Sequence, residues 1–127
     1  MKFNKVILFL LVIAFSTFAC AKKNPKIVFQ STSFDLGIVS SPDRIKTFDA
    51  VFDNKGGDGL VISEIRTDCD CTTTEFPRKE FSRRTSGKIK IRVDLSGFFP
   101  GKVIKKVAVY TNSKKSPTVI TITANVK

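Results

Sequence analysis

Apolar side chains occupy every second position in several short stretches of this chain, and this alternation limits the folds available to it. The clearest stretch is 88–95, where apolar residues alternate with charged ones; similar patterns occur at 47–52, 106–110 and 120–126. Successive side chains of a β-strand point to opposite faces, so each stretch predicts a strand with one apolar face. The residues expected to point inward are Phe48, Ala50, Phe52, Ile89, Ile91, Val93, Leu95, Val107, Val109, Ile120, Ile122, Ala124 and Val126.

Turn-forming residues end the expected strands, at 54–59, 96–101 and 111–117. The stretch 60–65 is more continuously apolar, as in a central strand or in one that contains a bulge. Strands with one apolar face must cover it, and two antiparallel sheets do so within about 100 residues. Crossover helices have no room, which disfavours a parallel sheet. We expect an all-β, immunoglobulin-like antiparallel sandwich of about seven strands, with a small barrel as the alternative.

The first residues have the organisation of a secretory signal. Lys2 and Lys5 precede the unbroken apolar run 6–15, and small residues follow it up to Cys20. The run is too short to span a bilayer as a helix, which takes about 20 residues. We therefore assign residues 1–19 to a signal peptide that precedes the folded domain, rather than to a buried core helix.

Cys20 indicates how this signal is removed. Residues 17–20 resemble a bacterial lipobox, in which the cysteine becomes the lipid-modified first residue of the mature chain. An isolated cysteine at this place has no other evident purpose, so we expect lipid attachment at Cys20. Ordinary cleavage after Ala21, which leaves a soluble protein, is the alternative. The basic residues 20–26 then form a tether beside the membrane, and 27–127 form the domain.

Motifs along residues 27–126 resemble those of a known bacterial family. In order, they are Phe34-Asp35-Leu36-Gly37, 48–56, Leu60-Val61-Ile62, Asp68-Cys69-Asp70-Cys71-Thr72, 87–93, 101–109 and Thr111-Asn112. The family is domain of unknown function 1573, which is similar to Hydin-like immunoglobulin-type domains. Asp70 departs from the glycine that the family usually has between its two cysteines. The resemblance implies an exported sandwich domain, often a lipoprotein, with no established activity.

Histidine is absent from the chain, which excludes the usual forms of several active sites. Serine-hydrolase triads, papain-like cysteine–histidine pairs and histidine-based zinc sites all require it. No other catalytic set of residues stands out in the sequence. We therefore expect a protein that is not an enzyme and that carries no cofactor.

Cys69 and Cys71, beside Asp68 and Asp70, are the one chemically distinctive group. They could be structural thiols, a disulfide favoured by an oxidising compartment, or a redox or metal site. Two thiolates supply half of a tetrahedral metal site, to which a neighbouring carboxylate could add oxygen ligands. Nearby carboxylates also oppose thiolate formation, because they raise the pKa of a thiol. A structural role is favoured, and a thiol-redox or metal-binding protein is the alternative function.

Basic residues outnumber acidic ones by 22 to 11, which gives a formal net charge of +11. A loop-like stretch and the polar side of 88–95 supply a candidate basic binding face: Arg78, Lys79, Arg83, Arg84, Lys88, Lys90 and Arg92. Such a face could bind an anionic envelope polymer, the membrane surface or an acidic protein, although a merely solvated face is the simpler interpretation. Nucleic acid is not an expected partner, because an exported, anchored protein rarely meets it.

The phenylalanines divide into expected core residues and undecided ones. Phe29, Phe34, Phe48 and Phe52 lie in strand-like runs and are expected in the core. The sequence does not decide whether Phe76 and Phe81 lie in the core. Phe98 and Phe99 lie in a turn and could either contact a partner or fold over the sandwich end.

Taken together, these features predict a membrane-tethered, immunoglobulin-like lipoprotein of the bacterial cell envelope that acts in binding or assembly. It would face the periplasm or the cell exterior. An envelope protein or an anionic polymer is the expected partner, besides the membrane itself. The exposed edge strands of an open sandwich would also suit one subunit of a larger assembly. The sequence leaves the oligomeric state open.

Overall fold

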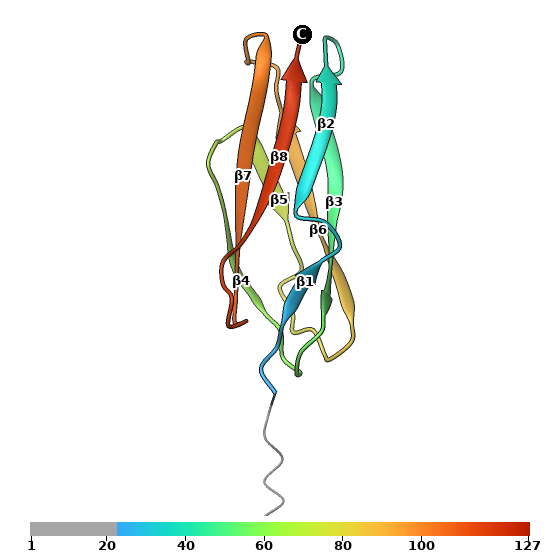
Figure 1. Cartoon of the computed structure of the whole chain (residues 1–127), viewed down its shortest axis with the longest axis vertical. Coiled ribbons are helices and arrows are strands. Elements are labelled where there is room, and N and C mark those ends of the chain that lie inside the picture. The colour runs from blue at the N-terminus through green and yellow to red at the C-terminus, as the bar shows by residue number, and fades with distance from the viewer. Residues whose placement is uncertain (1–22) are drawn as a thin grey trace, which may run out of the picture.

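Eight β-strands follow one another in residues 23–127, the part of the chain that this computed structural model describes (Figure 1). They are β1 (Ile27–Phe29), β2 (Ser33–Val39), β3 (Ile45–Asn54), β4 (Ile62–Thr67), β5 (Thr72–Glu75), β6 (Ser86–Asp94), β7 (Gly101–Thr111) and β8 (Thr118–Val126). The expected signal peptide and Cys20 lie outside the described residues. Across residues 23–127 no helix is long and apolar enough to cross a membrane.

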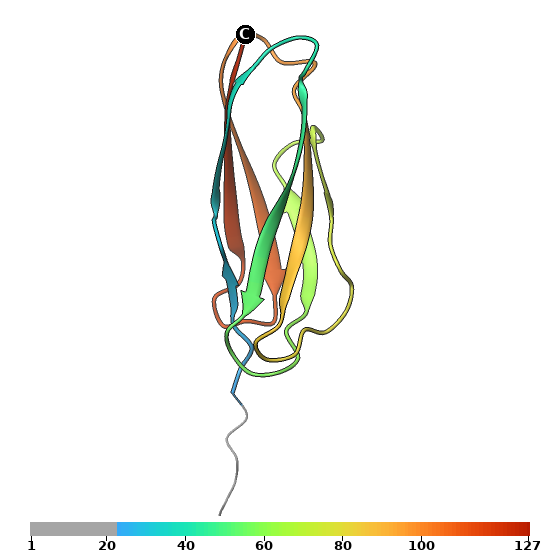
Figure 2. The same ribbon diagram turned by 90° about the vertical axis from the view of Figure 1, so that its right-hand side faces the viewer.

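The strands form two four-stranded sheets that face one another (Figure 2). Sheet 1 has the order β1-β3-β6-β5, and sheet 2 has the order β2-β8-β7-β4. All strand pairs are antiparallel except β2 and β8, which run parallel. The expected sandwich of about seven strands is confirmed, with two differences in detail: there are eight strands, and one pair is parallel. Both differences arise where the chain leaves β1 at the edge of sheet 1 and enters β2 at the edge of sheet 2.

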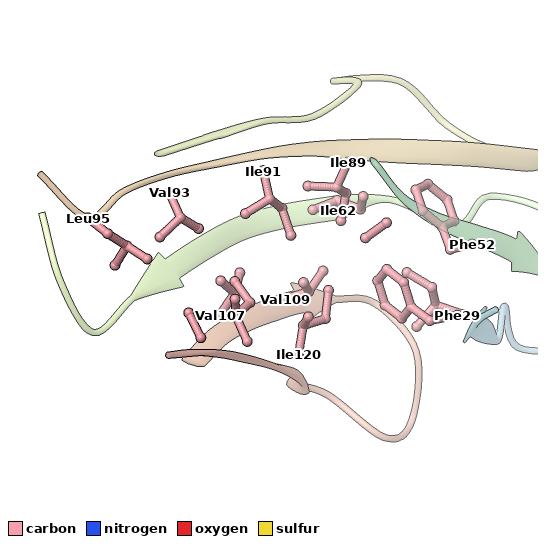
Figure 3. Packing of buried hydrophobic residues seen from close by; sticks show 14 of the residues in the cluster. Phe29, Phe52, Ile62, Ile89, Ile91, Val93, Leu95, Val107, Val109 and Ile120 are labelled. Atoms are coloured by element: carbon pink, nitrogen blue, oxygen red, sulfur yellow. The ribbon is translucent and has the colours of Figure 1, made fainter. Parts of the chain in front are cut away.

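Alternation along the strands places the core as expected. The core residues predicted from the sequence are all buried except Phe34 and Phe48, which are half-buried and pack on one another with ring centroids 4.6 Å apart. Figure 3 shows side chains from β6 meeting those from β7 and β8 across the space between the sheets. Burying these aliphatic side chains supplies the main driving force for folding, at roughly 25 cal/mol for each Å² of apolar surface.

One of the two interpretations of the apolar stretch 60–65 is a central strand, and this interpretation is wrong. The stretch enters β4, which lies at the edge of sheet 2. The other interpretation, a bulge, is confirmed, because the pairing of β4 with β7 shifts register between Ile62 and Glu64. Leu60 and Ile62 are both buried, and Leu60 forms an isolated bridge with Phe81. Leu60, just before β4, is therefore paired with the segment that connects β5 to β6.

Phe81 belongs to the core, in a cluster with Phe29 and Phe52. The Phe52 ring lies 5.8 Å from that of Phe29 and 5.0 Å from that of Phe81, in edge-to-face arrangements that favour aromatic pairs. Gly87 leaves room for this cluster, because a Cβ there would lie 2.6 Å from both Phe52 and Phe81. Phe76 is half-buried against the core.

The two ends of the sandwich differ in which parts of the chain they gather. At one end, here the base, residues 23–26 enter beside the loops 55–61, 76–85 and 112–117 (Figure 1). At the other end, the tip, the C-terminus lies beside the connections 40–44 and 95–100 (Figures 1 and 2). The entering chain and the β6–β7 turn are therefore at opposite ends of the long axis.

Candidate functional site

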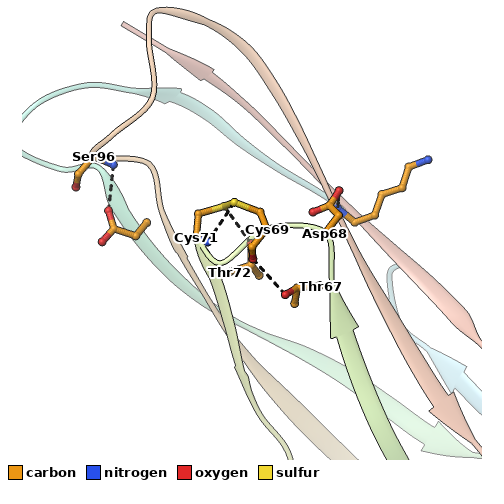
Figure 4. The surroundings of a disulfide bond; sticks show 8 residues. Thr67, Asp68, Cys69, Cys71, Thr72 and Ser96 are labelled. Carbon is orange, nitrogen blue, oxygen red and sulfur yellow. Dashed lines mark hydrogen bonds between the residues drawn. A yellow bond between two sulfur atoms is a disulfide. The ribbon is translucent and has the colours of Figure 1, made fainter.

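The β4–β5 turn carries both cysteines of the domain. Their sulfurs are joined in a disulfide, with a sequence separation of 2 and Cα atoms 5.1 Å apart (Figure 4). β4 ends at Thr67 and β5 begins at Thr72, so the short connection brings the two side chains together. Both cysteines are half-buried, which places the disulfide near the surface rather than in the core.

Backbone hydrogen bonds hold this turn in addition to the disulfide. The Cys69 carbonyl accepts from the Thr72 N–H at 3.2 Å and from the Thr67 hydroxyl at 3.2 Å (Figure 4). The Cys71 carbonyl accepts from the Asp94 N–H at 2.8 Å, which ties the turn to the end of β6. These bonds involve backbone atoms of the cysteines, so they do not require the sulfurs to be joined.

The carboxylates near the disulfide have other partners. Asp68 accepts a hydrogen bond from the Lys106 N–H at 3.0 Å, which fixes it against β7. Hydrogen bonds from the Ser96 hydroxyl and N–H hold the pKa of Asp94 below its usual value. Asp70 is exposed. Within residues 23–127, no three His, Cys, Asp or Glu side chains gather in a group that could hold a metal ion.

The predicted basic face separates into two groups. Arg78, Lys79, Arg83 and Arg84 lie in the connection between β5 and β6, whereas Lys88, Lys90 and Arg92 point outward from β6. Acidic residues of neighbouring strands flank the second group. Lys90 pairs in register with Asp49 on one side and Glu75 on the other, and Lys88 Nζ lies 3.3 Å from Asp49. All the residues of the predicted face are exposed, but the β6 group is interleaved with carboxylates.

Phe98 and Phe99, whose roles the sequence does not decide, have different environments in the turn between β6 and β7. Phe98 is half-buried against the core, with Lys105 Nζ 5.0 Å from its ring centroid. Phe99 is 90% exposed, the largest exposed fraction among the exposed large hydrophobic residues of the described chain. One residue therefore folds over the end of the sandwich, and the other is presented to solvent at the tip.

Asn54 is a structurally central residue that the sequence does not identify. Its side chain is fully buried at the base and uses both donors and its acceptor oxygen. The amide nitrogen donates to the carbonyls of Gly57 and Phe81, at 2.8 and 3.0 Å, while the oxygen accepts from the N–H groups of Lys26 and Gly56. No local pattern reveals this role, because its partners come from three separate segments.

Comparison with known proteins yields a family and several structures of similar fold. The family model described as "Protein of unknown function (DUF1573)" matches residues 27–126, which confirms the resemblance inferred from the motifs. No curated protein matches the chain in sequence. A crystal structure of a protein of unknown function from Porphyromonas gingivalis W83 is similar, with a TM-score of 0.71 and 17% identity over 87% of this chain and 50% of that one.

Two chaperones share the fold at lower similarity. The periplasmic chaperone SfaE gives a TM-score of 0.57 at 13% identity, over 80% of this chain and 57% of that one. The YadV chaperone gives a TM-score of 0.58 at 17% identity, over 80% of this chain and 52% of that one. The chain thus spans about half the length of these structures. At such low identity the likeness concerns the fold alone, and it confirms the expected immunoglobulin-like sandwich.

Proposed function

This chain belongs to the DUF1573 family of proteins of unknown function, and we propose that it is a membrane-anchored lipoprotein of the cell envelope. Its immunoglobulin-like domain acts as a non-enzymatic module for binding or assembly. Lipid on Cys20 holds the base at the membrane, on the periplasmic or the outer side. The tip presents Phe99 to an envelope protein.

The observation that carries this proposal is the opposition of base and tip. The chain enters the sandwich at the base, where residue 23 follows Cys20 by three positions in the sequence. Phe99 is presented at the other end, close to Phe98, whose carbonyl accepts a hydrogen bond from Arg44 beside the C-terminus. An exposed aromatic side chain is typical of a protein contact. A domain tethered at one end displays such a contact away from the membrane.

The similar structures support an envelope location. SfaE is a periplasmic chaperone, and the sandwich of this chain has the same fold. An exported location also agrees with the disulfide between Cys69 and Cys71, because disulfides persist in oxidising compartments.

Replacing Cys20 by Ser is expected to move the protein from the membrane fraction to the soluble fraction. A lipid chain binds the membrane through its buried methylenes, at about 0.8 kcal/mol each, and the serine cannot carry it. Fractionation of cells, with the intact mass of the purified chain, measures the effect. The variant Cys69→Ser/Cys71→Ser is the control and should stay with the membrane. A wild-type chain that begins after Ala21 and carries no lipid would contradict the proposal.

Replacing Phe99 by Ser is expected to weaken partner binding about 30-fold, as for an aromatic residue at the centre of an interface. Photo-crosslinking in cells, with the crosslinker placed at residue 98, compares capture by the wild type and the variant. Ile104→Ser is the matched control, because Ile104 is 49% exposed on the outer face of sheet 2. Equal losses for both variants would mean that the tip has no special role in binding.

A second function, thiol–disulfide exchange, is favoured by the hydrogen bonds of the β4–β5 turn. These bonds use only backbone atoms of the cysteines, so opening the disulfide removes none of them. In the exchange, two thiols of a reductant become a disulfide, and they pass two electrons and two protons to the cysteine pair. For this function we expect both cysteines to react with a thiol reagent once reduced glutathione is present.

Labelling in reduced glutathione also distinguishes the exchange function from a purely structural disulfide. A structural disulfide stays oxidised in glutathione, and Cys69→Ser/Cys71→Ser then lowers the free energy of unfolding by only about 1.5 kcal/mol, because the closed loop is so short. Urea unfolding of wild type and variant gives this value. Full oxidation in reduced glutathione would exclude the exchange function, and binding of zinc by the reduced pair would indicate the metal alternative.

A further inference from the structure

The base of the sandwich carries a concentration of basic side chains that is separate from the predicted face on β6. The entering segment and three loops contribute exposed basic residues: Lys23, Lys26, Lys55, Arg83, Arg84, Lys114 and Lys115. Backbone contacts bring their segments together. Gly57 N–H donates to the Asn24 carbonyl at 2.8 Å, and Ile27 N–H donates to the Ser113 hydroxyl at 3.0 Å. We call this set the basal cations.

None of these side chains forms an ion pair with a carboxylate in the part of the chain that the structure describes. The ion pairs found in residues 23–127 are Lys46–Asp43, Arg66–Glu64 and Lys88–Asp49, and none of them includes a basal cation. Two carboxylates also lie at the base: Asp58, which accepts a hydrogen bond from the Arg83 N–H at 2.6 Å, and Glu80, and both line a second hollow together with Lys23. The tip carries Arg44 and Lys127 beside Asp43 and Asp94. Basic residues are therefore more numerous at the end where the chain enters.

An open hollow lies among the basal cations. It has a volume of about 600 Å³ and is lined by Lys23, Asn24, Pro25, Lys26, Ile27, Gly56, Lys114, Lys115 and Thr118. The hollow has lysines on two sides, from the entering segment and from the β7–β8 turn. Gly56 permits the entering segment to lie this close, because a Cβ there would lie 2.7 Å from the Pro25 carbonyl carbon. The four lysines of the lining give the hollow a positive charge, which attracts phosphate-bearing groups.

We infer that the basal cations bind the headgroups of anionic phospholipids. This inference rests on the proposed anchor at Cys20. Three residues of chain span at most about 10 Å, so a lipid on Cys20 keeps Lys23 within that distance of the membrane surface. Charges interact over about this distance at physiological ionic strength. The anchor and the basal cations thus act on the same surface, and together they hold the tip away from it.

Binding to vesicles tests the inference without the lipid. The chain from residue 20 to 127 with Cys20→Ser contains all eight strands but cannot be acylated. We expect it to sediment with vesicles of phosphatidylglycerol and phosphatidylcholine, but not with phosphatidylcholine alone. Each lysine near an anionic surface contributes about fivefold to binding, so Lys114→Gln/Lys115→Gln should lose about 25-fold.

The matched control is Lys102→Gln/Lys106→Gln, which removes the same charge from exposed positions on β7. It should lose less than about twofold, because these lysines face away from the base. Equal losses for the two pairs, or equal binding to both kinds of vesicle, would overturn the inference. Because no lipid is attached, either result leaves the anchor at Cys20 untouched, and the fractionation of Cys20→Ser tests that anchor separately.

Discussion

Replacing Asn54 by Leu is expected to lower the free energy of unfolding by about 3 kcal/mol. The substitution keeps the volume but leaves the carbonyls of Gly57 and Phe81 and the N–H groups of Lys26 and Gly56 without their side-chain partner. Because Asn54 is fully buried, water cannot replace all of these bonds. Urea unfolding followed by circular dichroism gives the value.

Asn112 provides the control for this prediction. It also makes two hydrogen bonds to the backbone at the base, to Gly59 and from Val61, at 2.7 and 2.9 Å. Asn112 is exposed, so water can hydrate those groups, and Asn112→Leu should cost less than about 1 kcal/mol. If the two variants lost equal stability, burial would not determine the importance of Asn54. A selective loss would mean that burial makes the hydrogen bonds of Asn54 important for stability.

Replacing Phe52 by Ala is expected to cost about 3–5 kcal/mol, the range found when a large aromatic side chain is removed from a core. Phe52 is 0% exposed and contacts both Phe29 and Phe81 through its ring edge or face. Its loss leaves a cavity between β3 and the β5–β6 connection. Neighbouring side chains cannot fill this cavity fully, because Gly87 contributes no side chain beside it. Thermal and urea unfolding measure the loss.

Phe99→Ala tests whether this cost comes from burial. The same atoms are removed from a side chain that is 90% exposed, and stability should stay within about 0.5 kcal/mol of the wild type. A loss below about 1 kcal/mol for Phe52→Ala would contradict the central place given to the aromatic cluster. The pair of variants also separates folding from function, because only Phe99 is proposed to contact a partner.

The alternation of apolar residues predicts most of the fold because a strand must point every second side chain inward. Along β6, Ile89, Ile91 and Val93 are fully buried as the pattern requires. The pattern does not show how strands are ordered. The parallel pairing of β2 with β8 depends on contacts such as Ser33 with Thr121, which no local stretch reveals. The same limit applies to the edge position of β4.

The candidate sites also include some that the local sequence predicts and others that only the fold assembles. Cys69 and Cys71 are neighbours in the sequence, so their proximity can be expected without a fold. The basic face could be predicted only along one strand, because the acidic partners of Lys88 and Lys90 come from β3 and β5. The basal cations belong to segments as distant as Lys26 and Lys114, and only the folded domain brings them together. Charge composition therefore leads to the expectation of an anionic partner, but it does not predict which surface would meet that partner.

The parallel pairing of β2 and β8 has a consequence for the order of events in folding. A polypeptide that emerges from its amino end exposes β2 long before β8 has appeared. Until then one edge of sheet 2 has no neighbour, and contacts between residues so far apart in sequence form slowly. The nascent sandwich therefore stays open, with its aliphatic interior exposed to solvent, until β8 arrives to close it.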